Sequence, residues 1–406
     1  MLTPGTSQRQ VCTVKPHSPA EQSSLRESAT RPLHLPPFFD KFVVMKRTTL
    51  ITAALLLACT ICGAETIKGS DSRISYIGRT EVQEDGSVSF DWSATTFRFS
   101  FKGKTLTMAC SANQTEYFNL WIDSEQGPIE DRVLKVWSDT LITLVTTKKA
   151  AEHTIILQKR TEGEFGAFTL NELYTDGQFK QAPEPRPRLI EFIGDSYTCG
   201  YGIEALHHDG PFVVAEENPA RTYADILGRL FNAETVHISH SGRGVVRNYG
   251  DYDKTENMVV RYCQTFDELK KDAWTPTYKP DLVVIYLGTN DFSEGKQPAL
   301  WLWCQGYKKL LEKVHEFHGP DVPIICMASP CDELMDDYVY AAVERSGVKG
   351  VQVVPIMKGC FRYDDIDLGA AWHPNYSGNR KVASVVAPFV SSLMNWDLPM
   401  KSYEFK

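Results

Sequence analysis

LIEFIGDS, at residues 189–196, joins a short apolar run directly to a Gly-Asp-Ser triplet. A run of this length and composition is typical of a buried β-strand. A serine in the sharp turn after such a strand projects beyond the sheet edge, where its hydroxyl can attack a substrate. A Gly-Asp-Ser triplet arises by chance in about one chain in ten of this length, so the triplet alone is weak evidence of a catalytic serine. Ser196 is the candidate nucleophile, and a helix N-cap is the alternative role.

Three companion motifs lie downstream. Ser241-Gly242 follows an apolar run at 235–239, Gly288-Thr289-Asn290-Asp291 follows another at 281–287, and His373-Pro374-Asn375 stands near the C-terminus. Together with Ser196 they supply a nucleophile, a base and hydrogen-bond donors in chain order.

Apolar runs and amphipathic stretches alternate through the second half of the chain. This alternation predicts a doubly wound, flavodoxin-like α/β domain over residues 189–398, whose ligands bind beyond the C-terminal ends of the strands. The expected strands lie at 189–193, 235–239, 281–286, 323–327 and 351–356, and the expected helices at 219–231, 300–317, 334–346 and 376–394. Three of the four motifs follow expected strand ends, so we expect the sheet edge to bring them together.

The first half of the chain has a different pattern. Between residues 74 and 173, short runs alternate polar with apolar residues and are separated by turn residues such as Asp85-Gly86. This pattern predicts an antiparallel β-sandwich domain over residues 70–180. Residues 181–188 carry a proline at every second position, which favours a short stiff linker over helix or central strand.

The N-terminal residues predict export. Residues 1–44 are rich in Ser, Pro, Arg and Gln and show no apolar period, so we interpret them as a mis-assigned start or a disordered leader. Residues 45–64 begin with a second methionine and contain a basic pair, an apolar run and a small-residue cleavage site, as a signal peptide does. Cys59 is an alternative lipid-anchor site. We expect an exported protein that is periplasmic, extracellular or on the cell surface, with no membrane span.

Composition excludes several classes of function. The net charge is −8, and no basic stripe suggests nucleic acid as a partner. The seven cysteines beyond residue 64 match no zinc-ligand spacing, and no other cluster of His, Cys or carboxylates does. We therefore expect neither a metal nor another cofactor.

Four sequence blocks resemble those of the SGNH, or GDSL, hydrolase superfamily. The blocks are GDSYTCGYG at 194–202, SGRG at 241–244, GTNDF at 288–292 and WHPN at 372–375. Within the superfamily, the chain is most similar to carbohydrate esterase family two, the acetyl esterases that act on plant-wall xylan or mannan. The resemblance covers roughly residues 70–398 and implies that the N-terminal sandwich is a jelly roll.

The chemistry of ester hydrolysis assigns a role to each motif. Ser196 is the expected nucleophile and His373 the base that takes its proton and later protonates the leaving sugar hydroxyl. The backbone N–H groups of Ser196 and Gly242 and the side-chain amide of Asn290 are the expected oxyanion-hole donors.

One position departs from the superfamily. The triad acid usually stands three residues before the histidine, where this chain has Ala370. A main-chain carbonyl can orient the imidazole instead, and the resemblance implies a Ser–His dyad of that kind. Asp367 is the first alternative acid, with Asp365 and Asp364 just upstream.

Aromatic residues near the motifs are candidates for stacking against sugars. Tyr249 falls where family members keep a substrate-contacting tyrosine, and Trp301 and Trp372 also flank the motif loops. Two other functions remain open at this stage. One is another SGNH enzyme, a lipase, arylesterase or thioesterase. The other is a catalytically decayed glycan-binding protein.

Overall fold

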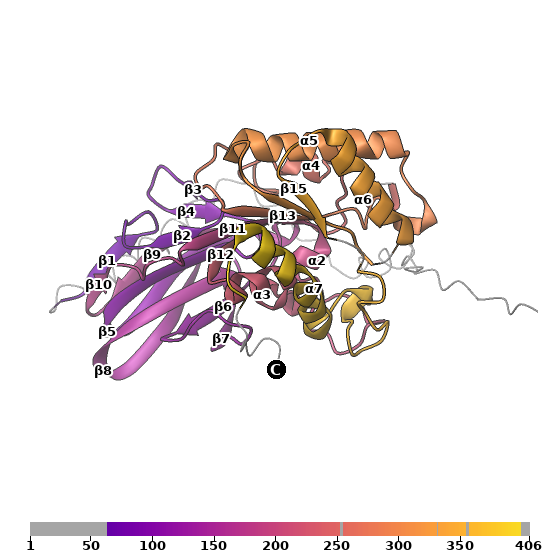
Figure 1. Ribbon diagram of the computed structural model, residues 1–406. Coiled ribbons are helices and arrows are strands. Elements are labelled where there is room, and N and C mark those ends of the chain that lie inside the picture. The colour runs from indigo at the N-terminus through magenta and orange to yellow at the C-terminus, as the bar shows by residue number, and fades with distance from the viewer. Residues whose placement is uncertain (1–62, 252–254, 331, 355–356, 399–406) are drawn as a thin grey trace, which may run out of the picture.

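The computed structural model describes residues 63–251, 255–330, 332–354 and 357–398. The leader, most of the predicted signal peptide and the candidate anchor Cys59 lie outside these residues. In the part of the chain that the structure describes, no helix combines the length and the apolar character needed to cross a membrane. Figure 1 shows a β-rich domain beside an α/β domain whose helices cover a smaller sheet.

The N-terminal domain is built from antiparallel strands, as the alternation predicted. Two long strands, β5 and β8, pair with each other along most of their length, and the pairing is irregular on either side of Thr105. On one side of this irregularity β5 also pairs with β2 and β10, and on the other with β9. The strands are β1 (Glu65–Lys68), β2 (Ser75–Ile77), β3 (Glu81–Val82), β4 (Val88–Phe90), β5 (Thr96–Ala112), β6 (Glu116–Ile122), β7 (Arg132–Val136), β8 (Thr140–Lys159), β9 (Phe168–Thr175) and β10 (Gln178–Lys180).

A phenylalanine-rich core joins strands of this domain that are not neighbours in the sheet. Phe118 on β6 and Phe168 on β9 belong to strands that are not neighbours in the sheet, yet their ring centroids are 4.5 Å apart. Phe97 and Phe99 on β5 join the same core and are fully buried. Burial of side chains from opposing strands is the packing that a sandwich requires.

The C-terminal domain is a five-stranded parallel sheet in the order β12-β11-β13-β14-β15. This order, with β11 at the reversal point, is that of the doubly wound fold. The fold class predicted from the sequence, a β-rich antiparallel domain followed by an α/β domain, is confirmed. The strands are β11 (Arg188–Gly194), β12 (Ala233–Ser239), β13 (Leu282–Tyr286), β14 (Ile324–Met327) and β15 (Val351–Val354).

Helices cover both faces of this sheet. Alternate residues of β13 enter two separate cores: Val283 and Ile285 pack with α4, α5 and α6, whereas Leu282 and Val284 pack with α3 and α7. The α-helices are α2 (Ser196–Cys199), α3 (Tyr223–Leu230), α4 (Met258–Arg261), α5 (Leu300–His318), α6 (Glu333–Ser346) and α7 (Tyr376–Met394). The expected helix at 219–231 is divided: Pro219–Arg221 forms a 3-10 turn, and Thr222 is extended before α3 begins.

The two domains meet through buried polar contacts. Asp91, just after β4, accepts hydrogen bonds from the backbone N–H groups of residues 267, 268 and 269 at 2.8, 2.8 and 2.9 Å. Arg98 on β5 forms an ion pair with Glu234 on β12 at 2.7 Å. Because each buried charge has a partner in the other domain, separation of the domains would leave these groups unpaired, at the cost of several kcal/mol per ion.

Candidate active site

The nucleophile turn depends on a glycine and a short helix. Ser196 opens α2 immediately after β11, and the side chain of Asp195 caps this helix by accepting the Tyr197 N–H at 3.2 Å. A Cβ on Gly194 would lie 1.9 Å from Thr198 Oγ1, so no larger residue fits there. As the first residue of a helix, Ser196 has a backbone N–H without an intrahelical acceptor, which leaves it available to an oxyanion.

The expected base, His373, is within hydrogen-bond distance of Ser196. Nε2 of His373 is 2.8 Å from Ser196 Oγ, and Nδ1 of the same ring is 2.9 Å from the carbonyl oxygen of Ala371. Ala371 and Trp372 both adopt positive φ values, 50° and 63°. Two consecutive non-glycine residues in this region are strained, and such strain is found where a site requires an unusual backbone path. Here the path brings a main-chain carbonyl to Nδ1.

The electrostatics of His373 follow from this arrangement. Burial lowers the pKa of His373 to about 4, against the opposing effect of its backbone contacts with Ala371 and Ala370. A carboxylate partner would raise this pKa, because it stabilises the imidazolium. The imidazole is therefore neutral at pH 7, as a general base must be.

The carboxylates considered as substitute acids are bonded elsewhere. Asp367 is buried and accepts from the Arg362 N–H at 2.7 Å, Ser377 Oγ at 2.9 Å and Lys381 Nζ at 2.5 Å. Asp365 lies against the imidazoles of two other histidines, and Asp364 bonds to the Arg362 side chain. Ala370, in the usual position of the acid, is fully buried against Gly202.

The expected oxyanion donors lie on loops that are bonded to one another and to the nucleophile turn. Gly242 has φ +75°, a conformation that favours glycine, and its carbonyl accepts the Tyr249 N–H at 2.8 Å. The Asn290 amide nitrogen donates to the Arg243 carbonyl at 2.9 Å and to Asp195 at 3.3 Å. Asn290 is thereby bonded to the Gly242 loop and to the residue before the nucleophile.

Asp291, a motif residue to which the sequence assigned no role, fixes the same loop. Asp291 is fully buried and accepts the backbone N–H groups of Val245, Val246 and Arg247, each at 2.8 Å. A Cβ on Gly244 would lie 2.2 Å from this carboxylate. Burial raises the pKa of Asp291 to about 6. The position of Asp291 beside Asn290 was the only signal available in the sequence.

The candidate sugar-stacking residues differ in position. Trp372 belongs to the strained turn beside His373 and is 42% exposed, with its ring edge-on to His208. Tyr249 begins the 3-10 turn Tyr249–Asp251 beside Gly242. Trp301 is 68% exposed at the second position of α5.

Two aromatic residues near the base were not anticipated. The Tyr201 ring centroid is 4.6 Å from that of His373, and Phe212 stacks on Tyr201 at 3.6 Å. Phe165, from the β-rich domain, stacks on Phe212 at 5.4 Å. These rings form a continuous apolar wall from the β-rich domain to the base.

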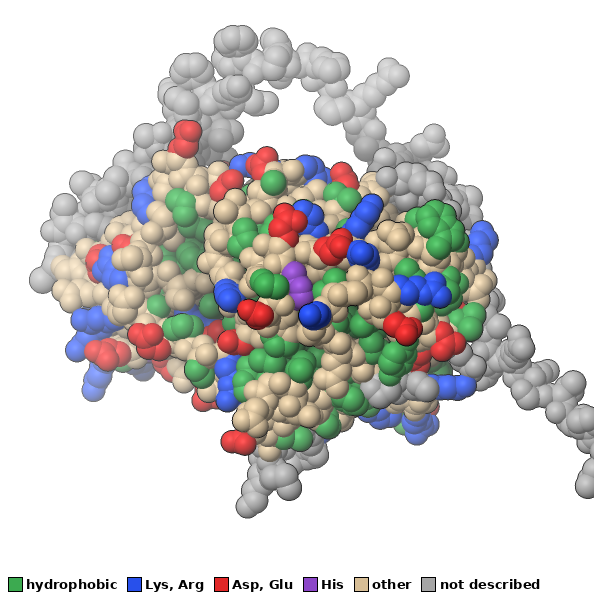
Figure 2. Space-filling view, turned by 45° about the horizontal axis from the view of Figure 1, so that its top comes forward, with side chains coloured by type: hydrophobic (Ala, Val, Ile, Leu, Met, Phe, Trp, Pro, Cys, Tyr) green, Lys and Arg blue, Asp and Glu red, His purple; other side chains and the backbone are tan. Residues whose placement is uncertain are grey.

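Charges of both signs are interspersed over the face drawn in Figure 2. Such mixing produces no large field of one sign on this face, so electrostatic steering of a polyanion is not expected there. A neutral ligand does not need electrostatic steering to bind.

The chain matches two family models that together cover most of the described structure. Residues 76–185 match the carbohydrate esterase 2 N-terminal domain, and residues 192–381 match the GDSL-like lipase/acylhydrolase family. The junction between the two matches falls in the proline-rich segment.

Named relatives and solved structures agree with these matches. The chain is 29% identical over 334 residues to cellulase/esterase CelE of Acetivibrio thermocellus, an alignment that covers 80% of this chain and 40% of that longer protein. It is 25% identical to an acetylxylan esterase/glucomannan deacetylase of Cellvibrio japonicus, with 83% and 95% covered. A solved family two carbohydrate esterase from Clostridium thermocellum, in complex with cellohexaose, is 28% identical with a TM-score of 0.72, covering 80% of this chain and all of that one.

Proposed function

Because this chain is a carboxylic ester hydrolase that belongs to carbohydrate esterase family two, we propose that it removes O-acetyl groups from plant-wall xylan or mannan through an acyl-enzyme intermediate. The observation that carries the proposal is the 2.8 Å contact between His373 Nε2 and Ser196 Oγ, with Nδ1 bonded to a main-chain carbonyl. A neutral imidazole in this position accepts the serine proton without a third side chain.

The reaction proceeds in two stages. Ser196 Oγ attacks the acetyl carbonyl carbon while His373 Nε2 takes its proton, and the tetrahedral oxyanion lies against the donors of Ser196, Gly242 and Asn290. His373 then returns the proton to the sugar oxygen, the C–O bond breaks, and the deacetylated glycan leaves. In the second stage water loses a proton to His373 and attacks the acetyl-serine, and His373 returns that proton to Ser196 Oγ as the C–Oγ bond breaks and acetate leaves.

The Ala371 carbonyl fulfils part of the role of the usual acid. It accepts the Nδ1 proton, so the tautomer with a free lone pair on Nε2 is fixed. It carries only a partial charge, so it stabilises the imidazolium less than a carboxylate would. The lowered pKa of His373 is consistent with that difference.

Acetate release from polysaccharide tests the proposal. Acetylated xylan and acetylated glucomannan are incubated with the wild-type protein and with Ser196→Ala, and acetate is measured over time. We expect the wild type to deacetylate at least one of the two and a folded Ser196→Ala variant to lose at least about a thousandfold in rate. Hydrolysis of 4-nitrophenyl acetate without release from either polysaccharide would contradict the proposed substrate.

Binding of an unacetylated glucan chain is a second candidate function of the same site. It is supported by the aromatic wall of Tyr201, Phe212 and Phe165 beside the base and by the cellohexaose complex of the 28%-identical relative. Titration calorimetry with cellohexaose measures such binding directly. Inhibition of acetate release at the same concentrations would place both ligands in one site.

Export through the predicted signal peptide is part of the proposal, because acetylated cell-wall polysaccharide lies outside the cell. N-terminal sequencing of the native protein is expected to find Glu65, or a lipid-modified Cys59. A native N-terminus before Met45 would contradict this interpretation.

A further inference from the structure

A loop of the β-rich domain contacts the segments that carry the candidate catalytic residues. After β8 ends, Arg160 donates to the Glu217 carbonyl at 2.9 Å, and Gly163 packs so closely that a Cβ there would lie 2.6 Å from that of Asp267. Glu162, between them, is fully buried. The loop therefore places a carboxylate inside the α/β domain.

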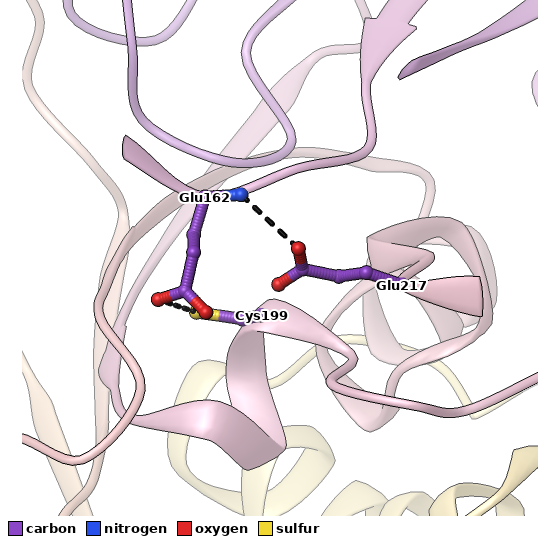
Figure 3. Close-up of side chains that lie close together, drawn as sticks. All are labelled: Glu162, Cys199 and Glu217. Carbon is purple, nitrogen blue, oxygen red and sulfur yellow. Dashed lines mark hydrogen bonds between the residues drawn. The ribbon is translucent and has the colours of Figure 1, made fainter. Parts of the chain in front are cut away.

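The Glu162 carboxylate contacts both catalytic segments. Its Oε2 atom accepts the Ser241 N–H at 2.6 Å. The same atom lies 3.6 Å from the Cys199 sulfur, a contact drawn in Figure 3. Ser241 immediately precedes Gly242, and Cys199 ends the short helix that Ser196 begins. One side chain from the other domain thus connects the expected oxyanion loop with the nucleophile helix.

A second carboxyl group faces the first. The backbone N–H of Glu162 donates to Glu217 Oε2 at 3.2 Å, and carboxylate oxygens of both residues lie within 4.8 Å of each other and of the Cys199 sulfur. Among the described residues, the Oε1 atoms of Glu162 and Glu217 have no hydrogen-bond partner, although both side chains are fully buried. Two carboxyl groups in such a place raise each other's pKa.

The surroundings decide which of the two is charged. Burial raises the pKa of both glutamates, and that of Glu217 rises well above its ordinary value. Glu162 also faces His240, whose pKa is raised to about 9 by Asp267 and Glu164 against the effect of burial, so this imidazole is cationic at pH 7. The Ser241 N–H further favours the charged form of Glu162. These contacts favour the charged form of Glu162.

We propose that Glu162 is a positioning residue that the β-rich domain supplies to the esterase: its carboxylate holds the Ser241 N–H and thereby fixes Gly242 as an oxyanion donor. The inference rests on the proposed function, because it concerns the same oxyanion hole. Asp291 holds the far end of this loop through residues 245–247, so a carboxylate anchors the loop at each end. Donors held in this way need no reorganisation when charge develops in the transition state.

Three substitutions test the proposal with 4-nitrophenyl acetate, which reports Ser196 chemistry whatever the natural glycan. Glu162→Ala removes the acceptor and is expected to lower kcat about 10- to 100-fold while KM changes less than about threefold, since the lost interaction acts mainly in the transition state. Glu162→Gln keeps an oxygen for the Ser241 N–H and is expected to stay within about fivefold of wild type. Glu234→Gln is the matched control, because Glu234 is another buried carboxylate of the same interface, paired with Arg98 away from the loop.

The control separates positioning from simple interface stability. Glu234→Gln is expected to lower the melting temperature but leave kcat within about twofold. Wild-type kcat in a folded Glu162→Ala protein would overturn the proposal, as would a kcat loss in Glu234→Gln equal to that of Glu162→Ala. If Glu162→Ala does not fold, Glu162→Gln decides: a loss of more than about 100-fold in kcat would overturn the proposal, and near-wild-type kcat supports it.

Two further measurements make the result independent of the proposed function. Crystal structures of wild type and Glu162→Gln are expected to show the same Ser241–Gly242 backbone, even if the wild type hydrolyses no ester and the proposed function fails. A displaced loop in that variant would overturn the inference. Elemental analysis of the purified protein is expected to find no stoichiometric metal, and an ion bound by Glu162, Cys199 and Glu217 would overturn the role proposed for Glu162.

Discussion

Acidification tests the dyad most directly, because of its two side chains only His373 titrates in the acidic range and Ser196 does not. An unperturbed histidine loses its proton near pH 6.5, whereas burial lowers the pKa of His373 to about 4. The sign follows from the lowered value: the free base persists to lower pH, so activity is retained on acidification. His373 as a whole residue is only partly buried, and solvent moderates such shifts, so we expect the acidic inflection below about pH 5.5.

The expected effect is large enough to measure. At pH 5 a base of pKa 4 is about nine-tenths neutral and a base that titrates at pH 5.5 about one-quarter neutral, whereas a base of pKa 6.5 is only about 3% neutral, so kcat/KM differs by roughly 8- to 30-fold. The assay is kcat/KM for 4-nitrophenyl acetate between pH 4 and 8, followed at a wavelength where product absorbance is independent of pH. An inflection at or above pH 6 would refute the assignment of a buried His373 without a carboxylate partner.

Unfolding at low pH must be separated from titration of the base. Asp91 and Asp291 are buried and their pKa values are raised to about 6. For such groups the folded state binds protons more tightly than the unfolded state, so their stabilising contribution grows as the pH falls through 6 toward 4. They therefore add no tendency to unfold in this window. The melting temperature at each pH, with recovery of activity at pH 7, provides the control.

The remaining predictions concern the acid and the metal. Asp367→Asn is expected to keep kcat within a few-fold of wild type, because Asp367 bonds to Arg362, Ser377 and Lys381. His373→Ala is expected to lose nearly all of kcat. A drop of about a thousandfold in kcat of folded Asp367→Asn would identify a triad acid. Ala370→Asp buries an unpaired carboxylate against Gly202 and should lower the melting temperature without raising kcat, and a faster, stable variant would contradict this. Prolonged chelation should leave activity unchanged, and loss restored by zinc or calcium would show the opposite.

The sequence predicted the elements whose signals are local. β11 and the turn that carries Ser196 follow from an apolar run that ends in Gly-Asp-Ser, and β13 with Asn290 follows from the same pattern. The parallel order of the sheet then places both motifs at one edge. The functional roles assigned to these residues stay predictions, since geometry alone does not measure catalysis.

What the sequence did not predict depends on contacts between distant segments. Glu162 stands in an unremarkable loop 79 residues before Ser241 and meets it only when the two domains dock. The orientation of His373 was likewise open, because whether a carboxylate or a carbonyl reaches Nδ1 depends on the backbone path of the turn. Positive φ at Ala371 and Trp372 has no sequence signal, since neither residue type favours that conformation.

The strained turn and the missing acid have a common explanation in the packing around residue 370. A Cβ on Gly202 would lie 2.7 Å from the Ala370 side chain, and the Ala370 N–H donates to the Gly202 carbonyl at 3.1 Å. Position 370 is therefore used to join the histidine segment to the loop after the nucleophile helix, and no charged side chain fits there. The next residue, Ala371, turns into the left-handed region and accepts the imidazole proton through its carbonyl. The strain of that turn, about 1–3 kcal/mol per residue, is offset by the close packing on either side of it. Because the turn brings a carbonyl to His373 and leaves no room for an acid, the site is a Ser–His dyad.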